Sequence, residues 1–353
     1  MSMVLNFALQ PKQGLRCIVF AAVLLSAAAS TARAEDVGDF YRGKTVEMIV
    51  GASAGGTYDA YARALTRYLT AHIPGNPTIV AKNMPGAGSL VAARYLYVQA
   101  PKDGTSIGTI MRGAVMEPLI GDKEKANFDS RKFNFLASAS TANGVTCFVR
   151  SDAKVQTFKQ VFTEPLIVGA SARGSAIGDT PRVINNWLKT KFKIVSGYNG
   201  TPDTIIAFER GELEGICGLQ IGDLPRQVPS WNEGKVKVIV QIGMKSDEEL
   251  NKLHVPEIWD FLKDPADRTV GELVFAQLEF GRPFVAPPNV PTDRVAALRK
   301  AFDDTFKDPQ FLADVDRLKL ELDPRSGADV QALVAKLFEA PPELVARARE
   351  IVE

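Results

Sequence analysis

Histidine and cysteine are scarce in this sequence. Its 353 residues include two histidines, His72 and His254, and three cysteines. Two histidines this far apart, without clustered cysteines, argue against a zinc site and leave few candidate bases for a catalytic serine. A G-x-G-x-x-G loop is also missing where a dinucleotide-binding fold would place it. We therefore expect no metal and no cofactor.

A charge excess of either sign is absent as well. The chain has 42 basic and 41 acidic side chains, a formal net charge of +1. Residues 1–34 contain three basic side chains and no acid, so the other 319 residues carry 39 basic and 41 acidic side chains. This balance creates no field that attracts a polyanion, so nucleic acid is not an expected partner. The length suits two α/β lobes better than one compact domain.

Long apolar runs are missing after residue 34. No later segment approaches the ~18 apolar residues of a membrane span. Earlier in the chain, Lys12 and Arg16 precede an uncharged run at residues 18–29, and Ala32-Arg33-Ala34 follows it. A basic segment, an apolar segment and a small-x-small site in this order are typical of a signal peptide. We expect residues 1–34 to be cleaved and the mature chain to be secreted.

Cys147 and Cys217 are the only cysteines after residue 34. An oxidising compartment would allow them to pair. Both lie in strand-like runs, however, where a buried free cysteine is also common. Their spacing alone leaves both states open.

Short β-rich runs alternate with helical stretches, which predicts βαβ units and largely parallel sheets. After the first strand, Tyr61, Leu65, Tyr68 and Leu69 fall on one face of a helix. Residues 283–290 form a proline-rich passage, and amphipathic helices at 292–306 and 327–352 close the chain, the second broken near Pro341. The expected strands are residues 46–50, 78–81, 106–110, 145–149, 166–168, 193–195, 215–219 and 236–242.

One segment recurs 118 residues later in the chain. Val50-Gly51-Ala52-Ser53-Ala54-Gly55-Gly56-Thr57 returns as Val168-Gly169-Ala170-Ser171-Ala172-Arg173-Gly174-Ser175, with six of eight positions identical. Each copy ends an expected strand and opens an expected helix. Turns of this kind draw on few residue types, so chance is one explanation. The other is that two lobes offer the same kind of loop to a ligand held between them.

A glycine-rich turn from a strand into a helix exposes backbone N–H groups and the positive end of the helix dipole, which together form an anion site. Both copies lie at the carboxyl ends of strands, where open α/β sheets bind ligands. Ser53, Thr57, Ser171 and Ser175 add hydroxyl donors that suit a carboxylate. Arg173, the one cation in either loop, could pair with a second carboxylate or simply lie in solvent or bridge the lobes.

Gly51-Ala52-Ser53-Ala54-Gly55 also satisfies the G-x-S-x-G pattern of a hydrolase nucleophile. That interpretation needs a histidine base, and it needs several strands before the nucleophile, whereas this loop follows the first strand. The second copy breaks the pattern but keeps the character of the loop. The alternative function, a secreted serine hydrolase that uses Ser53, is therefore the weaker one, and we expect no enzymatic activity.

Two other groups near these loops have alternative roles. Asp59, in the first turn of the first helix, stabilises the dipole, orients the loop or binds a ligand hydroxyl or amine. Tyr198, Asn199 and Thr201 follow another strand of the second half, where they either reach the ligand or serve only as a turn.

Several short motifs, in order along the chain, resemble those of the tripartite tricarboxylate transporter substrate-binding proteins, also called the Bug family. Each motif is weak by itself, but their order and spacing together are specific, and the likeness covers nearly all of the chain after residue 34. The motifs are Gly55-Gly56-Thr57-Tyr58-Asp59, Asn83-Met84-Pro85-Gly86-Ala87-Gly88, Ala100-Pro101-Lys102-Asp103-Gly104, residues 169–175, Tyr198-Asn199-Gly200, Gly211-Glu212-Leu213-Glu214-Gly215 and Pro287-Pro288-Asn289-Val290-Pro291.

This resemblance implies a type II periplasmic-binding-protein fold in which two α/β lobes close on a ligand. Lobe one would comprise residues 35–143 and 277–353, and lobe two residues 144–276. It further implies a monomeric periplasmic receptor for a small di-, tri- or aromatic carboxylate. Its partner would be a membrane permease of one large and one small subunit, or alternatively a sensor kinase. The expected ligand-binding residues are Ala52, Ser53, Gly55, Gly56, Thr57, Tyr58, Asp59, Ser171, Ala172, Arg173, Gly174, Ser175, Tyr198 and Thr201.

The sequence departs from the family pattern at both loops. Gly51 and Ala52 replace the usual proline and aromatic residue before the double glycine. Arg173 stands where a small or amide residue is common, and Asn199 replaces a lysine. The ligand of this chain can therefore differ from that of a typical member.

Overall fold

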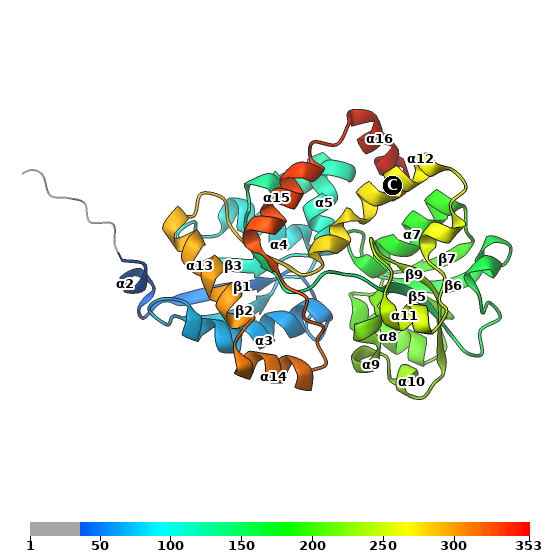
Figure 1. Ribbon diagram of the computed structural model, residues 1–353, viewed down its shortest axis with the longest axis horizontal. Coiled ribbons are helices and arrows are strands. Elements are labelled where there is room, and N and C mark those ends of the chain that lie inside the picture. Colours follow the sequence, from blue (N-terminus) through cyan, green and yellow to red (C-terminus); the bar gives the residue numbers. More distant parts are fainter. Residues whose placement is uncertain (1–35) are drawn as a thin grey trace, which may run out of the picture. The chain divides into compact units, whose positions relative to one another are not determined.

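The computed structural model describes residues 36–353, so the expected signal peptide at residues 1–34 lies outside the described part. From Val37 onward the chain forms one compact unit that contains two β-sheets with helices packed on them (Figure 1). Among the described helices, none is both long and apolar enough to cross a membrane. We call the six-stranded sheet with its helices lobe one, and the five-stranded sheet with its helices lobe two.

The sheet of lobe one has six strands in the order β11-β4-β10-β3-β1-β2. β1 lies between β2 and β3 and is parallel to both. Its side chains from Met48 to Val50 are fully buried, because helices cover both faces of this part of the sheet. The strands are β1 (Thr45–Val50), β2 (Thr78–Asn83), β3 (Ser106–Thr109), β4 (Asn134–Ser138), β10 (Pro283–Ala286) and β11 (Arg325–Ser326).

The sheet of lobe two has five strands in the order β7-β6-β8-β5-β9. β6 is parallel to both of its neighbours, β7 and β8. β5 is antiparallel to β8 and β9. The strands are β5 (Val145–Arg150), β6 (Leu166–Ala170), β7 (Phe192–Ser196), β8 (Gly215–Gln220) and β9 (Val236–Ile242).

Both sheets are mixed. The predicted parallel arrangement holds for the strands whose ends carry the repeated loops, β1 and β6, with their neighbours. The antiparallel strands β5 and β10 each follow a stretch where the chain passes from one sheet to the other, so they enter their sheets from the opposite end. The passage at residues 283–290 thus begins with strand β10, and β4 is a further strand that the sequence pattern did not show.

Helices pack on the sheet of lobe one through the faces that the sequence predicts. In α3, Tyr61, Leu65 and Leu69 are buried, while Tyr68 is partly buried. α13 and α14 pack on α3, and α15 packs on β4. The larger helices of this lobe are α2 (Val37–Tyr41), α3 (Thr57–His72), α4 (Leu90–Arg94), α5 (Arg112–Ile120), α6 (Lys123–Ala126), α13 (Thr292–Thr305), α14 (Pro309–Arg317) and α15 (Gly327–Leu337).

The C-terminal helix α16 (Pro342–Val352) joins the two lobes. It packs on α7 and α12 of lobe two and on α5 of lobe one, and Figure 1 shows it beside α12. The predicted break between the last two helices is confirmed, since α15 ends at Leu337 and α16 begins at Pro342. The helices of lobe two are α7 (Ala176–Leu188), α8 (Thr201–Glu209), α9 (Leu224–Gln227), α10 (Pro229–Asn232), α11 (Glu248–Lys252) and α12 (Pro265–Phe275).

Short 3-10 and π-helical turns complete the chain. They are η1 (Ala87–Ser89), η2 (Tyr95–Gln99), η3 (Ser130–Lys132), η4 (Phe158–Phe162), η5 (Ile221–Asp223), η6 (Ile258–Phe261) and η7 (Ala276–Phe280). Two of them, η1 and η5, lie beside the cavity described below.

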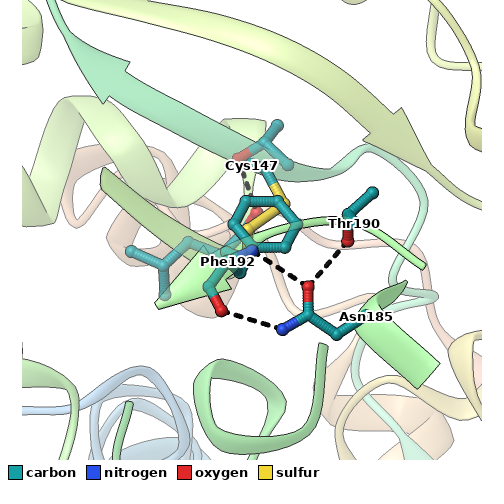
Figure 2. Close-up of a disulfide and its surroundings, with 7 residues drawn as sticks. Cys147, Asn185, Thr190 and Phe192 are labelled. Atoms are coloured by element: carbon teal, nitrogen blue, oxygen red, sulfur yellow. Dashed lines mark hydrogen bonds between the residues drawn. A yellow bond between two sulfur atoms is a disulfide. The ribbon is translucent and has the colours of Figure 1, made fainter. Parts of the chain in front are cut away.

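A disulfide joins the two cysteines whose state the sequence left open. Cys147 and Cys217 are register partners on the antiparallel strands β5 and β8, and their Cα atoms lie 4.0 Å apart. Both residues are buried. Nearby, the side chain of Asn185 accepts from the backbone N–H of Phe192 at 3.0 Å and donates to its carbonyl at 2.8 Å, which ties the end of α7 to β7 (Figure 2).

Replacing both cysteines with serine should lower the free energy of unfolding by about 2–4 kcal/mol, because the bond closes a loop of 70 residues in the unfolded chain. Urea unfolding of the double variant beside the oxidised and the reduced parent protein would measure this loss. The reduced parent should resemble the double variant. Equal stability of all three would show that the bond contributes nothing.

Candidate functional site

A cavity of about 790 Å³, with the solvent at its mouth included, lies between the two lobes. Lobe one contributes the β1–α3 loop, the turn around Gly88, and Arg112. Lobe two contributes the β6–α7 loop and the turn before α8. The carboxyl ends of β1, β3, β6 and β8 therefore meet at one place, as expected for ligand sites in open α/β sheets.

Four helices begin at this cavity. They are α3, α5, α7 and α8, whose first residues Thr57, Arg112, Ala176 and Thr201 all line it. The helices α3, α5 and α8 have no side-chain cap at their N-terminal ends, while Ser175 caps α7 by accepting from Gly178 N–H. Each uncapped end offers backbone N–H donors and about half a positive charge. The arrangement favours an anion.

The repeated segments have similar conformations in the two lobes. Gly55 and Gly174 both have positive φ, +80° and +83°, and each immediately precedes the residue that caps its helix. When the repeat is aligned from Val50 and Val168, the helix cap comes one residue later in the second segment, and Arg173 is the extra residue before the glycine with positive φ. The repeated sequence therefore marks two similar turns that are offset by one residue.

In each lobe, a carboxylate in the first turn of the helix accepts a hydrogen bond from the glycine-rich turn before it. Asp59 accepts from Gly55 N–H at 2.9 Å, and Asp179 accepts from Gly174 N–H at 2.9 Å. Burial alone would raise the pKa of Asp59, but hydrogen bonds from Arg63, Gly55 and Asn83 lower it below its ordinary value. Asp59 thus stays ionised and orients the loop, which is one of the roles that the sequence allowed.

Most of the expected binding residues lie together at the cavity. Its lining includes Ala52, Ser53, Gly56, Thr57, Tyr58, Ser171, Ala172, Ser175 and Thr201. The lining does not include Gly55, Asp59, Arg173, Gly174 and Tyr198. Tyr198 packs against the apolar core of lobe two instead.

Arg173 points away from this cavity. Its guanidinium donates to the carbonyl oxygens of Val352 and Glu353, at 3.0 and 2.8 Å. The extra residue in the loop is thus directed toward the C-terminal helix. A role for Arg173 in gripping a second carboxylate has no geometric support in this structure.

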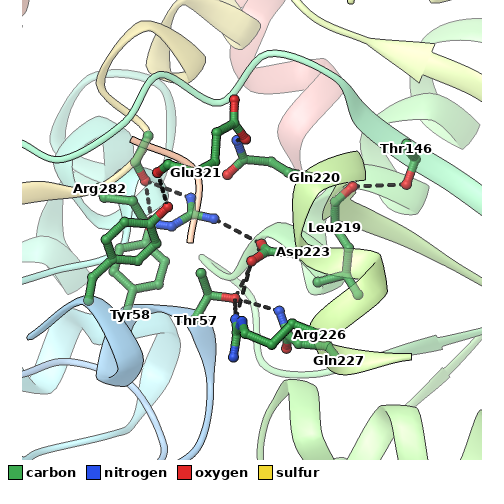
Figure 3. A network of polar contacts seen from close by, with 12 residues as sticks. Thr57, Tyr58, Thr146, Leu219, Gln220, Asp223, Arg226, Gln227, Arg282 and Glu321 are labelled. Carbon is green, nitrogen blue, oxygen red and sulfur yellow. Dashed lines mark hydrogen bonds and ion pairs between the residues drawn. The ribbon is translucent and has the colours of Figure 1, made fainter. Parts of the chain in front are cut away.

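Two hydroxyl groups of lobe one bond directly to lobe two. Ser53 Oγ donates to the carbonyl of Asn199 at 3.1 Å. Thr57 Oγ1 donates to Asp223 Oδ2 at 3.2 Å and accepts from Gln227 at 2.6 Å (Figure 3). These bonds hold the lobes against each other at the edge of the cavity.

A buried ion pair forms part of the cavity wall. Arg282, on the return path to lobe one, donates to Asp223 Oδ2 at 3.1 Å, and its guanidinium lies 5.0 Å from the ring centre of Tyr58 (Figure 3). Both charged side chains are less than one tenth exposed. Burial alone would lower the pKa of Arg282, but Asp223 raises it above its ordinary value. Arg282 therefore stays charged, and its bond to Asp223 joins the lobes.

Sequence reasoning missed Arg112, Asp223 and Arg282. Arg112 and Asp223 each lie three positions after the end of a strand, β3 and β8, so a search for charged residues just after strand ends could have found them. Arg282 precedes a strand, and no pattern in its surroundings marks it.

No family model and no curated protein matches the sequence. Solved structures do match, over most of both chains. The periplasmic binding protein BugD superimposes with a TM-score of 0.68 at 19% identity, covering 89% of this chain and 99% of its own. MatC from Rhodopseudomonas palustris with bound malate gives 0.65 at 21%, covering 88% and 99%. A second R. palustris protein, with adipate, gives 0.66 at 17%, covering 87% and 97%.

The chain has a periplasmic-binding-protein fold. The expected two-lobed α/β architecture is thereby confirmed, with mixed sheets. In such a fold the space between the lobes is the natural place for a ligand, and here it is the cavity at which the four helices begin.

The hydrolase interpretation finds no support at Ser53. The Ser53 hydroxyl donates to a backbone carbonyl, that of Asn199. His72 ends α3, about 22 Å along the helix from its first residue at 1.5 Å per residue, and there it bonds Asp308 at 3.0 Å. His254 lies in a loop, where its φ is +55°. Neither histidine is placed to activate Ser53.

Glu321 is a titratable group at the contact between the lobes. It belongs to lobe one, and Gln220 of lobe two donates to its Oε2 at 3.3 Å (Figure 3). Burial raises the pKa of Glu321 to about 7, an effect that Arg282 opposes and Asp223 reinforces. A carboxyl whose pKa is raised in the folded state favours folding when protonated, so its contribution is lost as the pH rises from about 4.5 to 7.

Replacing Glu321 with glutamine should remove this pH dependence. The variant should match the parent protein in stability near pH 4.5 and exceed it by about 1–3 kcal/mol at pH 8, because the parent then buries a carboxylate. Urea unfolding at both pH values would measure the difference. A variant that is less stable than the parent at pH 8 would contradict the assignment.

Proposed function

We propose that this chain is a periplasmic receptor of the tripartite tricarboxylate transporter substrate-binding family, and that it captures a small carboxylate between its lobes. The convergence of four helix N-termini on one cavity carries the proposal. An anion at that point accepts from the N–H groups of several helices together, and each helix contributes a favourable dipole. Hydroxyl groups of both lobes add neutral donors that suit carboxylate oxygens.

The solved structures of the same fold agree with a carboxylate. MatC was solved with malate and the second R. palustris protein with adipate. For the present chain we propose a di-, tri- or aromatic carboxylate. As part of the same proposal, the receptor is a periplasmic monomer that delivers its ligand to a membrane permease of one large and one small subunit.

Closure of the lobes on the ligand requires glycine at their contact. The backbone of Gly174 lies against Gly88 and against the first turn of α5, where a Cβ added at Gly113 would overlap the carbonyl oxygen of Gly174. Gly113 itself is helical, a conformation in which alanine is favoured over glycine by about 1 kcal/mol. Glycine at this position therefore serves the contact between lobes rather than the helix.

Replacing Gly113 with alanine should weaken the binding of the carboxylate ligand at least tenfold, because the methyl group keeps the lobes apart. The ligand-free variant should unfold at the same temperature as the parent or higher, because α5 gains helix propensity. Calorimetric titration and thermal unfolding would separate these effects. Unchanged affinity would show that the observed contact is not needed for binding.

The proposed function is tested first by thermal unfolding with a panel of mono-, di- and tricarboxylates, aliphatic and aromatic. A ligand that binds only the folded state stabilises it by about 4 kcal/mol at a thousandfold excess over Kd. One class of carboxylate should raise Tm clearly. No response to any member would contradict a carboxylate receptor.

The Ser53→Ala variant distinguishes the receptor from the hydrolase. In a receptor, this variant loses one hydroxyl and should bind the active carboxylate somewhat more weakly, by about tenfold. Neither the parent nor the variant should hydrolyse p-nitrophenyl esters. Ester turnover by the parent that disappears in the variant would establish the alternative.

A further inference from the structure

Arg112 is buried at the cavity with no carboxylate partner among the described residues. It is 6% exposed and lines the cavity as the first residue of α5. The Tyr58 hydroxyl interacts with its side chain and accepts from its backbone N–H at 3.2 Å. Asp223 is close enough to favour the charged form, but its oxygens accept from Arg282, Arg226 and Thr57. A guanidinium in this position has lost water without gaining an anion.

Arg282 provides the comparison within the same cavity. Both arginines are almost fully buried, yet the pKa of Arg282 is raised by Asp223, whereas burial lowers the pKa of Arg112 and the neighbouring Arg282 lowers it further. The two arginines differ in that Arg282 has a carboxylate partner, Asp223, and Arg112 has none among the described residues. Among the described residues that line the cavity, Arg112 and Arg282 are the cations and Asp223 is the one acid, so the lining has an excess of positive charge.

The position of Arg112 in its helix adds a third unfavourable contribution. A cation at the N-terminal end of a helix is repelled by the dipole, which favours anions there. α5 begins at Arg112, and its cap residue Met111 provides no side-chain acceptor. Burial, the neighbouring guanidinium and the helix dipole all oppose a positive charge at this position, and an anion in the cavity would relieve all three.

We infer that Arg112 is the residue that directly binds a carboxylate of the ligand and makes the cavity selective for anionic over neutral ligands. This inference rests on the proposed function and adds the residue that recognises the negative charge of the ligand. The backbone N–H groups at the start of α3 lie on the same lobe and can complete the contact, while the Tyr58 hydroxyl donates to the Gly281 carbonyl at 2.8 Å. Arg282, held by Asp223, is instead a structural residue that joins the lobes.

Three variants of the purified protein test this assignment without knowledge of the natural ligand. Arg112→Met replaces the charge with an apolar chain of similar length, Arg112→Lys keeps the charge without the planar fork, and Arg282→Met removes the paired arginine. Thermal unfolding is measured without ligand and with malate, adipate, citrate and benzoate, and with malamide, adipamide and benzamide as neutral probes.

Without ligand, Arg112→Met should raise Tm by a few degrees, because it removes an unpaired buried charge. Arg282→Met should lower Tm, because it leaves Asp223 short of a partner. With ligand, the carboxylate that stabilises the parent protein should bind Arg112→Met about 10- to 100-fold more weakly, with Arg112→Lys in between. The amides should stabilise none of the proteins.

The failures of the two proposals can be told apart. If no carboxylate stabilises the parent protein, the receptor function fails, and the role of Arg112 fails with it. If a carboxylate stabilises the parent and Arg112→Met equally, the receptor function stands and the role of Arg112 is overturned. It is also overturned if Arg112→Met lowers the ligand-free Tm as Arg282→Met does, since Arg112 would then be a structural residue.

Discussion

The buried pair of Arg282 and Asp223 connects the parts of this molecule on which the site depends. Arg282 comes from lobe one and Asp223 from lobe two, and their 3.1 Å contact lies in the wall of the cavity. Asp223 also accepts from Thr57, the first residue of α3, and so fixes where that helix begins relative to lobe two. The stacked ring of Tyr58 lies over the same guanidinium. One carboxylate thus places the two lobes, a helix N-terminus and an aromatic wall of the cavity.

This arrangement separates the two arginines of the cavity into different roles. A paired buried arginine holds structure together, because removing either partner leaves the other charge buried and alone. An unpaired one costs stability, and such a cost persists only where another requirement maintains it. The two buried arginines of the cavity are therefore not equivalent, and the presence or absence of a protein carboxylate is what distinguishes them.

The sequence predicted the strands and helices that carry the site because their signals are local. The alternation of β-rich and helical runs located β1, β6 and the helices after them. The eight-residue segment that occurs twice located the loops of both lobes that line the cavity. The strands β4 and β10 were not found, and the antiparallel pairing of β5 was not predicted, because which neighbour a strand pairs with depends on contacts far apart in the chain. Arg173 was chosen for its place inside a loop, yet the insertion that it represents turns its side chain toward α16. Charge partners also depend on distant residues, since Arg282 and Asp223 are 59 positions apart.

The contacts between the lobes bear on how a ligand could control closure. Hydrogen bonds such as Ser53 to Asn199 favour the lobes being together even without a ligand. A receptor that closed fully when empty would give its partner no signal, because a ligand changes an equilibrium only by its different affinity for the two states. An unpaired guanidinium at the cavity opposes closure, since closure removes water from it without supplying a protein anion. With Arg112 in this role, the hydrogen bonds between the lobes favour closure and the unpaired guanidinium opposes it. A ligand carboxylate that pairs with Arg112 removes that opposition.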